Sequence, residues 1–359
     1  MDIVALELIK ALQVIDHENL YFIFVKKGED HTCIQETSNF KIVEVPGVSY
    51  ADWEQFFLPI YVKKYDLDVL HCTSNTAPVF CPVPTIITLH DVIFLEKKKQ
   101  KGGLFNLYQQ LGKIYRRMIV PASIRRTQHI ITVSNYEKQQ INSVLNINSD
   151  KISVVYNSFG KHFRIPEDEP TLKSVLNKYD LPNEYIFYIG NTDPKKNMFN
   201  TLKAYGKYVV SVNNPLPLVI ADVDAKVLEQ VMQATNVYQF RHLIQITGYI
   251  YNRDLPFIYA GAKVFLYPSL RESFGIPVLE SMACGTPVIT SETSALPEIA
   301  GNAAWLVNPA DDNAISKALQ SSLADQGMRE AMIGKGFERI REFNWTNSAK
   351  NLLHIYQTV

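Results

Sequence analysis

The sequence KVFLYPSLRESFGIPVLESMACGTPVITS (263–291) reads as a strand, a short helix and a second strand in succession. Continuous apolar runs open and close it, and such runs are typical of parallel strands covered on both faces. Pro277 can begin a helix because its missing N–H needs no partner there, and Gly285 can end that helix. The stretch therefore predicts one parallel strand–helix–strand unit, with its helix over 277–284.

The same alternation is repeated along both halves of the chain. Apolar runs rich in β-branched residues predict buried strands at 21–25, 41–45, 68–71, 85–89, 129–133 and 151–156, and then at 185–190, 217–221, 243–248, 263–268 and 287–291. Helices are expected between them, for example over 197–212 and 311–323. This pattern is typical of an α/β protein with two doubly wound, Rossmann-like domains.

The domain boundaries follow from a polar stretch with Gly and Pro but no periodicity, at 157–170. The first domain is expected over 1–160 and the second over 161–343. The amphipathic segment 344–359 predicts a C-terminal helix that crosses back to the first domain. Parallel sheets of this kind bind ligands beyond the carboxyl ends of their strands, so a crevice there, between two facing sheets, is the expected site.

Composition limits the classes of function. The 359 residues exceed one ordinary hydrophobic core, and 47% apolar with 20% charged residues is ordinary for a packed protein. The formal net charge is zero, so no nucleic acid partner is expected. Four cysteines without paired or metal-ligand spacing indicate reduced thiols: Cys33, Cys72, Cys81 and Cys284. Without an apolar run of about 18 residues or a signal-peptide pattern, a cytoplasmic location is expected.

The segment 97–126 is the exception to this even charge, because it carries many basic residues and no acidic one. It also has apolar residues near helical spacing. A solvated helix with a stripe of core residues explains the pattern. The alternative is a face that rests on anionic lipid at the inner side of the cell membrane, or that grips a phosphorylated acceptor.

The start of the helix predicted at 277–284 suits a phosphate. Its free backbone N–H groups and the positive end of its dipole attract an anion, and Gly275 lets a ligand approach the backbone closely. Glu272 lies just before the helix and Glu280 about one turn inside it. One carboxylate can therefore meet hydroxyls on each side of a diphosphate, which is the layout of a nucleoside diphosphate sugar. Two glutamates at this spacing also occur by chance.

Four stretches resemble the retaining, two-domain glycosyltransferases of the GT-B fold that form glycosyltransferase family 4. They are VPTIITLHDVIFLE (83–96), YIGNTDPKKNMFNTLKAY (188–205), ITGYIYNRDLPFIYAGAKVFLYPS (246–269) and YPSLRESFGIPVLESMACGTPVITS (267–291). The resemblance covers nearly the whole chain and is densest in the second half. It implies two Rossmann-like domains that face a central cleft, with the acceptor on the first and the nucleotide sugar on the second.

The resemblance also implies roles for single residues. His90 would contact the transferred sugar, Lys196 the donor diphosphate and Glu272 the sugar hydroxyls, which makes these three the catalytic set. The remaining donor-binding positions are Lys195, Asn197, Gly248, Tyr249, Ile250, Ser273, Phe274, Gly275, Ile276, Val278 and Glu280. Within this set, 248–250 would line the base and Glu280 would engage the ribose. Judged by residue type alone, Lys195 is more often a merely exposed lysine, and a lone histidine such as His90 is more often structural.

The implied reaction moves a hexose from a nucleotide sugar to a saccharide or lipid-linked acceptor, with retention, in polysaccharide or glycolipid synthesis. Motif details favour a hexose donor, with GDP-mannose as a candidate, and residues 74–76 would line the acceptor cleft. The departing phosphate would take the acceptor's proton, and neither a cofactor nor a metal is expected. Asp222 and Asp224 could be mistaken for a metal-binding Asp-x-Asp pair, but helix capping explains them more simply.

One departure from the family pattern leaves other hypotheses open. The sequence MDIVALELIKALQVIDHENLYFIFV (1–25) begins inside what resembles the family's first helix, so the central first strand and its glycine-rich loop are expected to be missing. Such a loss would leave a gap in the first sheet. A relative that binds the donor without transferring it is therefore an alternative. A nucleotide-sugar epimerase of similar fold is another, although the residues Lys196, Glu272 and Glu280 argue against it.

Overall fold

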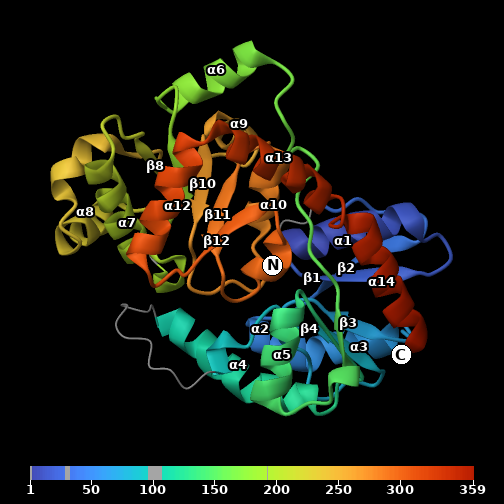
Figure 1. Ribbon diagram of the computed structural model, residues 1–359. Coiled ribbons are helices and arrows are strands. Elements are labelled where there is room, and N and C mark those ends of the chain that lie inside the picture. Colours follow the sequence, from blue (N-terminus) through green and yellow to red (C-terminus); the bar gives the residue numbers. More distant parts are fainter. Residues whose placement is uncertain (1, 29–32, 96–106, 192) are drawn as a thin grey trace. The chain divides into compact units, whose positions relative to one another are not determined.

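The computed structural model describes residues 2–28, 33–95, 107–191 and 193–359 (Figure 1). They form two units. Unit 1 comprises Met1–Asn157 and Trp345–Val359, and unit 2 comprises Ser158–Asn344. Part of the basic segment predicted at 97–126 lies outside the described residues. No described helix is long and apolar enough to cross a membrane.

Unit 2 is built on one sheet of six parallel strands in the order β12-β11-β10-β7-β8-β9. The strands are β7 (Ile186–Ile189), β8 (Leu218–Ala221), β9 (Ile244–Ile246), β10 (Val264–Tyr267), β11 (Val288–Ser291) and β12 (Ala304–Val307). Five were predicted, and β12 was not. Its sequence, AWLV (304–307), has a single β-branched residue, Val307, and so gives a weaker strand signal than the others.

Helices cover both faces of this sheet, which explains why its strands read as continuous apolar runs. In β7, Ile186 and Tyr188 pack on the face that carries α7 (Met198–Ser211), α8 (Ala225–Ala234) and α12 (Asp312–Ala324). Phe187 packs on the opposite face, against α9 (Leu255–Gly261), α10 (Ile276–Ala283) and α11 (Leu296–Ala300). Beyond this layer, α6 (Glu169–Lys178) contacts α9 and α13 (Gln326–Ile340) contacts α10.

The strands of unit 1 form two sheets. One holds four parallel strands in chain order: β3 (Leu70–Cys72), β4 (Thr85–Thr88), β5 (His129–Thr132) and β6 (Ile152–Val154). The other holds the parallel pair β1 (Tyr21–Lys26) and β2 (Phe40–Val45). All six were predicted as strands. Within the described residues, one edge of β1 and one edge of β3 have no strand partner.

Helices of unit 1 pack around these sheets. They are α1 (Asp2–Ile15), α2 (Tyr50–Asp52), the π-helical turn Trp53–Phe57, α3 (Leu58–Lys64), α4 (Leu107–Ile124), α5 (Asn135–Leu145) and α14 (Trp345–Thr358). Short 3-10 turns lie at Ile93–Leu95 and Ser149–Lys151, and in unit 2 at Pro194–Lys196 and Tyr238–Leu243. On the four-stranded sheet, Val120 and Ile124 of α4 and Ile141 of α5 enter one apolar cluster.

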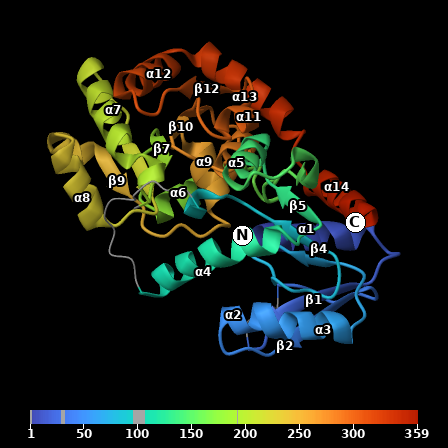
Figure 2. The same ribbon diagram turned by 90° about the horizontal axis from the view of Figure 1, so that it is seen from below.

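The C-terminal helix α14 belongs to unit 1, and both views show it beside α1 (Figures 1 and 2). Ser348 at its start donates a hydrogen bond to the carbonyl oxygen of Tyr156. Near its end, the Tyr356 hydroxyl lies 2.7 Å from Nδ1 of His71, whose Nε2 lies 2.7 Å from the Thr88 hydroxyl. Both ring nitrogens of this partly buried histidine are thus occupied, and desolvation of the ring lowers its pKa to about 4.

This histidine predicts a loss of stability in acid. The folded-state pKa of His71, about 4, lies below its ordinary value of 6.5. Between these two pH values, His71 is protonated in the unfolded chain and neutral in the folded chain. Stability is complete above pH 6.5 and falls as pH drops toward 4, by about 2 kcal/mol at pH 5. In the His71→Gln variant this part of the pH dependence should vanish.

Calorimetric melting at pH 7 and pH 5 measures the effect, with the exposed His17→Gln as the matched control. An equal pH dependence in wild type and His71→Gln would contradict the assignment.

Candidate active site

The site in unit 2 lies where its strand order reverses. β7 and β10 are hydrogen-bonded neighbours, yet the chain leaves β7 toward β8 on one side and leaves β10 toward β11 on the other. The loops that follow these two strands therefore diverge at the carboxyl edge of the sheet, which is the position where folds of this kind bind ligands. The loop after β7 carries Lys195 and Lys196, and the loop after β10 carries Glu272 and Gly275.

Asn197 joins these loops. Its side-chain amide donates to the carbonyl oxygens of Pro268 (2.8 Å) and Pro309 (2.7 Å), which follow β10 and β12. Its φ of 64° is left-handed, a conformation that asparagine tolerates better than most residues. The side chain is buried, with 3% of the residue exposed. The structure thus gives this predicted donor-binding residue a positioning role, because its amide nitrogen is already engaged.

Lys196 and Glu272 meet beside the phenol of Tyr267. The Lys196 ammonium donates to Glu272 Oε1 at 2.8 Å and to the Tyr267 hydroxyl oxygen at 2.6 Å. The Tyr267 hydroxyl donates in turn to the same carboxylate oxygen at 3.0 Å. Burial and the adjacent Glu272 raise the pKa of Tyr267, so the phenol stays protonated and can donate. Two of the three predicted catalytic residues are therefore brought into direct contact.

The loop that carries Glu272 continues directly into α10. The residue before this helix is Gly275, with a φ of 104°, and a Cβ there would lie 2.7 Å from Leu296. Only glycine suits this position, and because glycine has no side chain, α10 has no side-chain N-cap. Pro277 has no N–H group, and the N–H of Val278 donates to the carbonyl oxygen of Gly275, so the positive end of the helix dipole is what α10 offers to the anion predicted there.

Glu280 lies in the last part of α10, where it accepts a hydrogen bond from the Tyr259 hydroxyl at 3.1 Å. Burial raises the pKa of its carboxyl group to about 7, and the hydrogen bond from Tyr259 opposes this shift only in part. Unlike Glu272, it has no cation among the ion pairs of the described residues. The structure thus holds a carboxyl group near its titration midpoint at neutral pH.

The other predicted donor-binding residues lie in different surroundings. Tyr249 is exposed. The preceding Gly248 has a positive φ, and a Cβ added to this glycine would have no atom within 4 Å. Ile250 packs at the edge of an apolar cluster, and Lys195 is partly exposed and pairs with Asp193 at 3.7 Å. The side chain of Val278 is buried in the core. The remaining members, partly or fully buried around the start of α10, are Ser273, Phe274 and Ile276.

His90 lies in unit 1, just after β4. Its backbone N–H donates to Asn75 Oδ1 at 2.6 Å, and its Nε2 lies 2.9 Å from the carbonyl oxygen of Thr73. The residue is 8% exposed, and burial lowers its pKa. His90 is thus held as a neutral imidazole at the carboxyl edge of the unit 1 sheet, together with the loop that contains Ser74 and Asn75.

Sequence reasoning missed Glu54, which is 1% exposed and lies in the π-helical turn before α3. Its carboxylate accepts hydrogen bonds from the hydroxyl groups of Thr76, Tyr50 and Tyr115 and from the Gln55 amide. A carboxylate so engaged fixes Thr76, in the predicted acceptor loop, against α4. Nothing in the sequence WEQFF (53–57) signals this role, because two of the partners, Thr76 and Tyr115, come from distant segments.

Of the two aspartates in the Asp-x-Asp sequence, Asp224 caps a helix, as predicted. Asp224 accepts from the backbone N–H groups of Lys226 and Val227 and so caps α8. Within the described part of the chain, no group of three or more His, Cys, Asp or Glu side chains gathers in a way that could hold a metal ion.

Solved structures define the class of fold. The structure of a glycosyltransferase from Rickettsia africae ESF-5 superposes with a TM-score of 0.71 at 17% identity, over 98% of this chain and 93% of that one. The crystal structure of WaaG, described as a glycosyltransferase involved in lipopolysaccharide biosynthesis, gives a TM-score of 0.70 at 14% identity. It covers 98% of this chain and 94% of its own. The predicted GT-B fold class is therefore confirmed.

Sequence comparisons define the family. The model described as "Glycosyl transferases group 1" matches residues 171–339, and the model described as "Glycosyltransferase Family 4" matches residues 1–159. The O-antigen chain mannosyltransferase RfbU of Salmonella typhimurium strain LT2 is 32% identical over 76% of this chain and 69% of its own length. The chain therefore belongs to the group 1 glycosyltransferases of family 4, as its motifs predicted.

A second relative is similar over a shorter part of its length. The O-antigen chain mannosyltransferase B of Escherichia coli is 32% identical over 240 residues, which is 66% of this chain. The match spans 62% of that protein.

Glu280 predicts an unusual effect of pH on stability. The folded-state pKa of about 7 lies above the ordinary value of 4.5, so its contribution to stability is complete below pH 4.5 and is lost as pH rises through 7. Through this group the Glu280→Gln variant should gain stability relative to wild type, by about 3 kcal/mol at pH 8 and by only about 1 kcal/mol at pH 5.

Differential scanning calorimetry at both pH values checks this, with the exposed Glu229→Gln of α8 as the control. The contrary result is a stability of Glu280→Gln, relative to wild type, that is lower at pH 8 than at pH 5. It would mean that folding stabilises the Glu280 carboxylate, which contradicts a pKa raised by burial.

Proposed function

We propose that the chain transfers a hexose from a nucleotide sugar to a hydroxyl group of a saccharide or lipid-linked acceptor, with retention at the anomeric carbon. The observation that carries this proposal is the contact of Lys196 with Glu272 and Tyr267, where the strand order of unit 2 reverses. Glu272 lies in the loop that leads directly into α10, so the contact brings a cation and a carboxylate to the loop before the positive end of this helix.

Lys196 would stabilise the departing diphosphate. An ammonium group has three protons, and Glu272 and Tyr267 accept two of them. The third is left for a phosphate oxygen, and the ammonium is already held in place before the ligand arrives. Charge developing on the leaving group is then met by a fixed donor and by the α10 dipole, which is the largest contribution that many enzymes make to rate.

Glu272 would hold the sugar. Its Oε1 accepts from Lys196 and Tyr267, and no hydrogen bond within the described residues engages Oε2. That oxygen can accept from the hydroxyl groups of the hexose and so orient its anomeric carbon. The bond from this carbon to the diphosphate oxygen breaks with its electron pair, and the acceptor oxygen bonds to the carbon on the same face. The acceptor's proton passes to the departing diphosphate, so Glu272 needs neither to attack nor to be protonated.

The other parts of the donor are assigned to further residues. We place the ribose at Glu280, the base at 248–250 and the transferred sugar near His90, as the family resemblance implies. The neutral state of His90 suits a hydrogen bond to a sugar hydroxyl. With Lys196 and α10 supplying positive charge, this scheme requires neither a metal nor a cofactor.

Mannose is the proposed sugar and GDP-mannose the proposed donor. Both relatives that are 32% identical to this chain are named as O-antigen chain mannosyltransferases. The same likeness supports a role in polysaccharide biosynthesis. A cytoplasmic location is part of this proposal.

We further propose that unit 1 touches an anionic membrane surface through α4. Two apolar side chains of this helix are exposed to solvent, Ile114 at 54% and Met118 at 69%. Exposed basic side chains accompany them, including Arg117 and Arg126. Such a face is suited to contact with acidic lipid headgroups.

Donor binding without transfer is the second candidate. The observation that favours it is the division of the unit 1 strands into two sheets, which leaves edges of β1 and β3 without strand partners. Isothermal titration with GDP-mannose, combined with radiolabelled transfer to an acceptor panel, separates the two. Binding without transfer or donor hydrolysis would leave the binding role alone.

The Lys196→Ala variant tests the proposed chemistry. Loss of a fixed donor to the leaving group should lower the transfer rate by about 10²–10³ at saturating donor, while melting temperature changes little. Lys195→Ala is the matched control, since it removes a neighbouring but more exposed lysine, and its rate should fall far less. A drop in melting temperature that parallels the loss of rate would instead mark Lys196 as structural.

The transfer rate is also expected to be unchanged by EDTA, because Lys196 and α10 neutralise the diphosphate in this scheme. The measurement is initial rate with and without chelator, followed by addition of Mg²⁺ or Mn²⁺. Strict dependence on a divalent ion would overturn the assignment of leaving-group stabilisation to the protein.

A further inference from the structure

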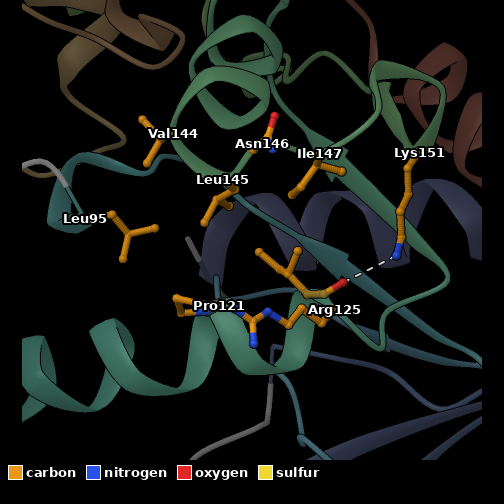
Figure 3. Close-up of a pocket in the computed structure, with 9 residues that line it drawn as sticks. Leu95, Pro121, Arg125, Val144, Leu145, Asn146, Ile147 and Lys151 are labelled. Atoms are coloured by element: carbon orange, nitrogen blue, oxygen red, sulfur yellow. Dashed lines mark hydrogen bonds between the residues drawn. The ribbon is translucent and has the colours of Figure 1, made fainter.

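A cavity of about 590 Å³ lies in unit 1 where α4 and α5 end (Figure 3). Its size is within the range that holds a small organic ligand. The helix ends precede β5 and β6, whereas His90 and the loop at 74–76 follow the ends of β4 and β3. Because these strands are parallel, the two regions lie toward opposite edges of the sheet, and the cavity is separate from the acceptor loop.

The walls of the cavity are largely apolar. Leu95, Leu145 and Ile147 line it and also pack on the core cluster beneath the sheet, so they form its inner wall. Val144 is partly exposed and faces it from the end of α5, and Pro121 faces it from α4 (Figure 3). A hydrocarbon chain placed here would lose contact with water on several sides, which favours an apolar ligand.

Two cationic side chains, Arg125 and Lys151, border the same cavity. The Lys151 ammonium donates to the carbonyl oxygen of Ile124 at 3.3 Å, which keeps it beside the end of α4. The lining contains no Asp or Glu, and neither cation takes part in an ion pair within the residues described. Uncompensated positive charge beside an apolar recess is complementary to an amphiphilic anion.

The exposed face of α4 leads into this cavity. Ile114, Met118, Pro121 and Arg125 follow one another at spacings of four, three and four residues, which places them on one stripe of the helix. The stripe passes from two exposed apolar side chains to the lining of the cavity and ends at one of its cations. A lipid layer in contact with Ile114 and Met118 would therefore bring headgroups and chains to the cavity.

We propose that the cavity binds a single anionic lipid from the membrane surface. Its hydrocarbon chain would lie against Leu95, Val144 and Ile147, and its phosphate between Arg125 and Lys151. The inference rests on the membrane contact proposed for α4 and deepens it, because it assigns a stoichiometric lipid site in addition to a charged surface. Binding would anchor unit 1 and orient it toward a lipid-linked acceptor.

The full chain should bind dihexanoyl phosphatidylglycerol as a monomer in solution, with saturation at one site per chain by calorimetric titration. Dihexanoyl phosphatidylcholine has the same chains without net charge, and inorganic phosphate has the charge without chains. Both should bind at least about tenfold more weakly. Equal affinity for inorganic phosphate would overturn the lipid assignment in favour of a simple anion site.

Two adjacent arginines supply a matched pair of variants. Arg125→Glu should weaken phosphatidylglycerol binding by about tenfold or more. Arg126→Glu makes the same charge change one residue away, where the guanidinium lies over the Phe80 ring at 4.2 Å and outside the cavity, and should change affinity by less than about twofold. Equal losses in both variants would show attraction by general charge and refute the site.

A third variant, Val144→Trp, fills the cavity without altering charge and should also abolish binding of the monomeric lipid. If it binds as well as wild type, the cavity is not the site.

Sedimentation with vesicles that contain phosphatidylglycerol distinguishes the cavity site from the membrane contact proposed for α4. Vesicle binding by wild type without any monomer binding would refute the cavity site and leave the α4 contact standing. Transfer to a water-soluble acceptor should be unchanged in Arg125→Glu.

Discussion

The two hydrogen bonds of the Asn197 amide are the constraint on which the candidate site depends. They tie the loop after β7 to the loops after β10 and β12, at the carboxyl edge of the unit 2 sheet. Lys196 directly precedes this residue, and its own carbonyl oxygen accepts from the Tyr188 hydroxyl. The backbone that carries the ammonium is thus fixed from both sides, so Lys196 reaches Glu272 without having to be ordered by a ligand.

Glu272, in the loop before α10, and Glu280, within α10, are the same residue type in different environments. Glu272 accepts from an ammonium and a phenol, whereas Glu280 accepts from a phenol alone and has a pKa raised by burial. A buried carboxyl group without a cation costs stability at neutral pH. Such a cost is typical of functional sites, and it supports the binding role proposed for Glu280.

Unit 1 combines a divided sheet with elaborate support for the loop after β3. The Glu54 carboxylate accepts hydrogen bonds from four side chains, one of which is Thr76. The Asn75 side chain accepts a hydrogen bond from the backbone N–H of His90. The same helix that supplies Tyr115 to Glu54 also lines the cavity with Pro121. The proposed lipid, bound at the end of α4, would therefore contact a helix that also holds Thr76, in the loop proposed to line the acceptor cleft.

The sequence by itself determined every described strand except β12, as well as the helix after Gly275, because apolar periodicity and backbone constraints act over a few residues. It also identified the family, through motifs such as Lys195–Asn197 and Glu272–Glu280. Only the tertiary structure decided that Lys196 binds Glu272, that the Asn197 amide clamps two loops, and that Glu54 is engaged by distant hydroxyls. It also revealed β12 and the cavity beside Arg125. These features depend on residues far apart in the chain, whose proximity arises only from strand order and packing.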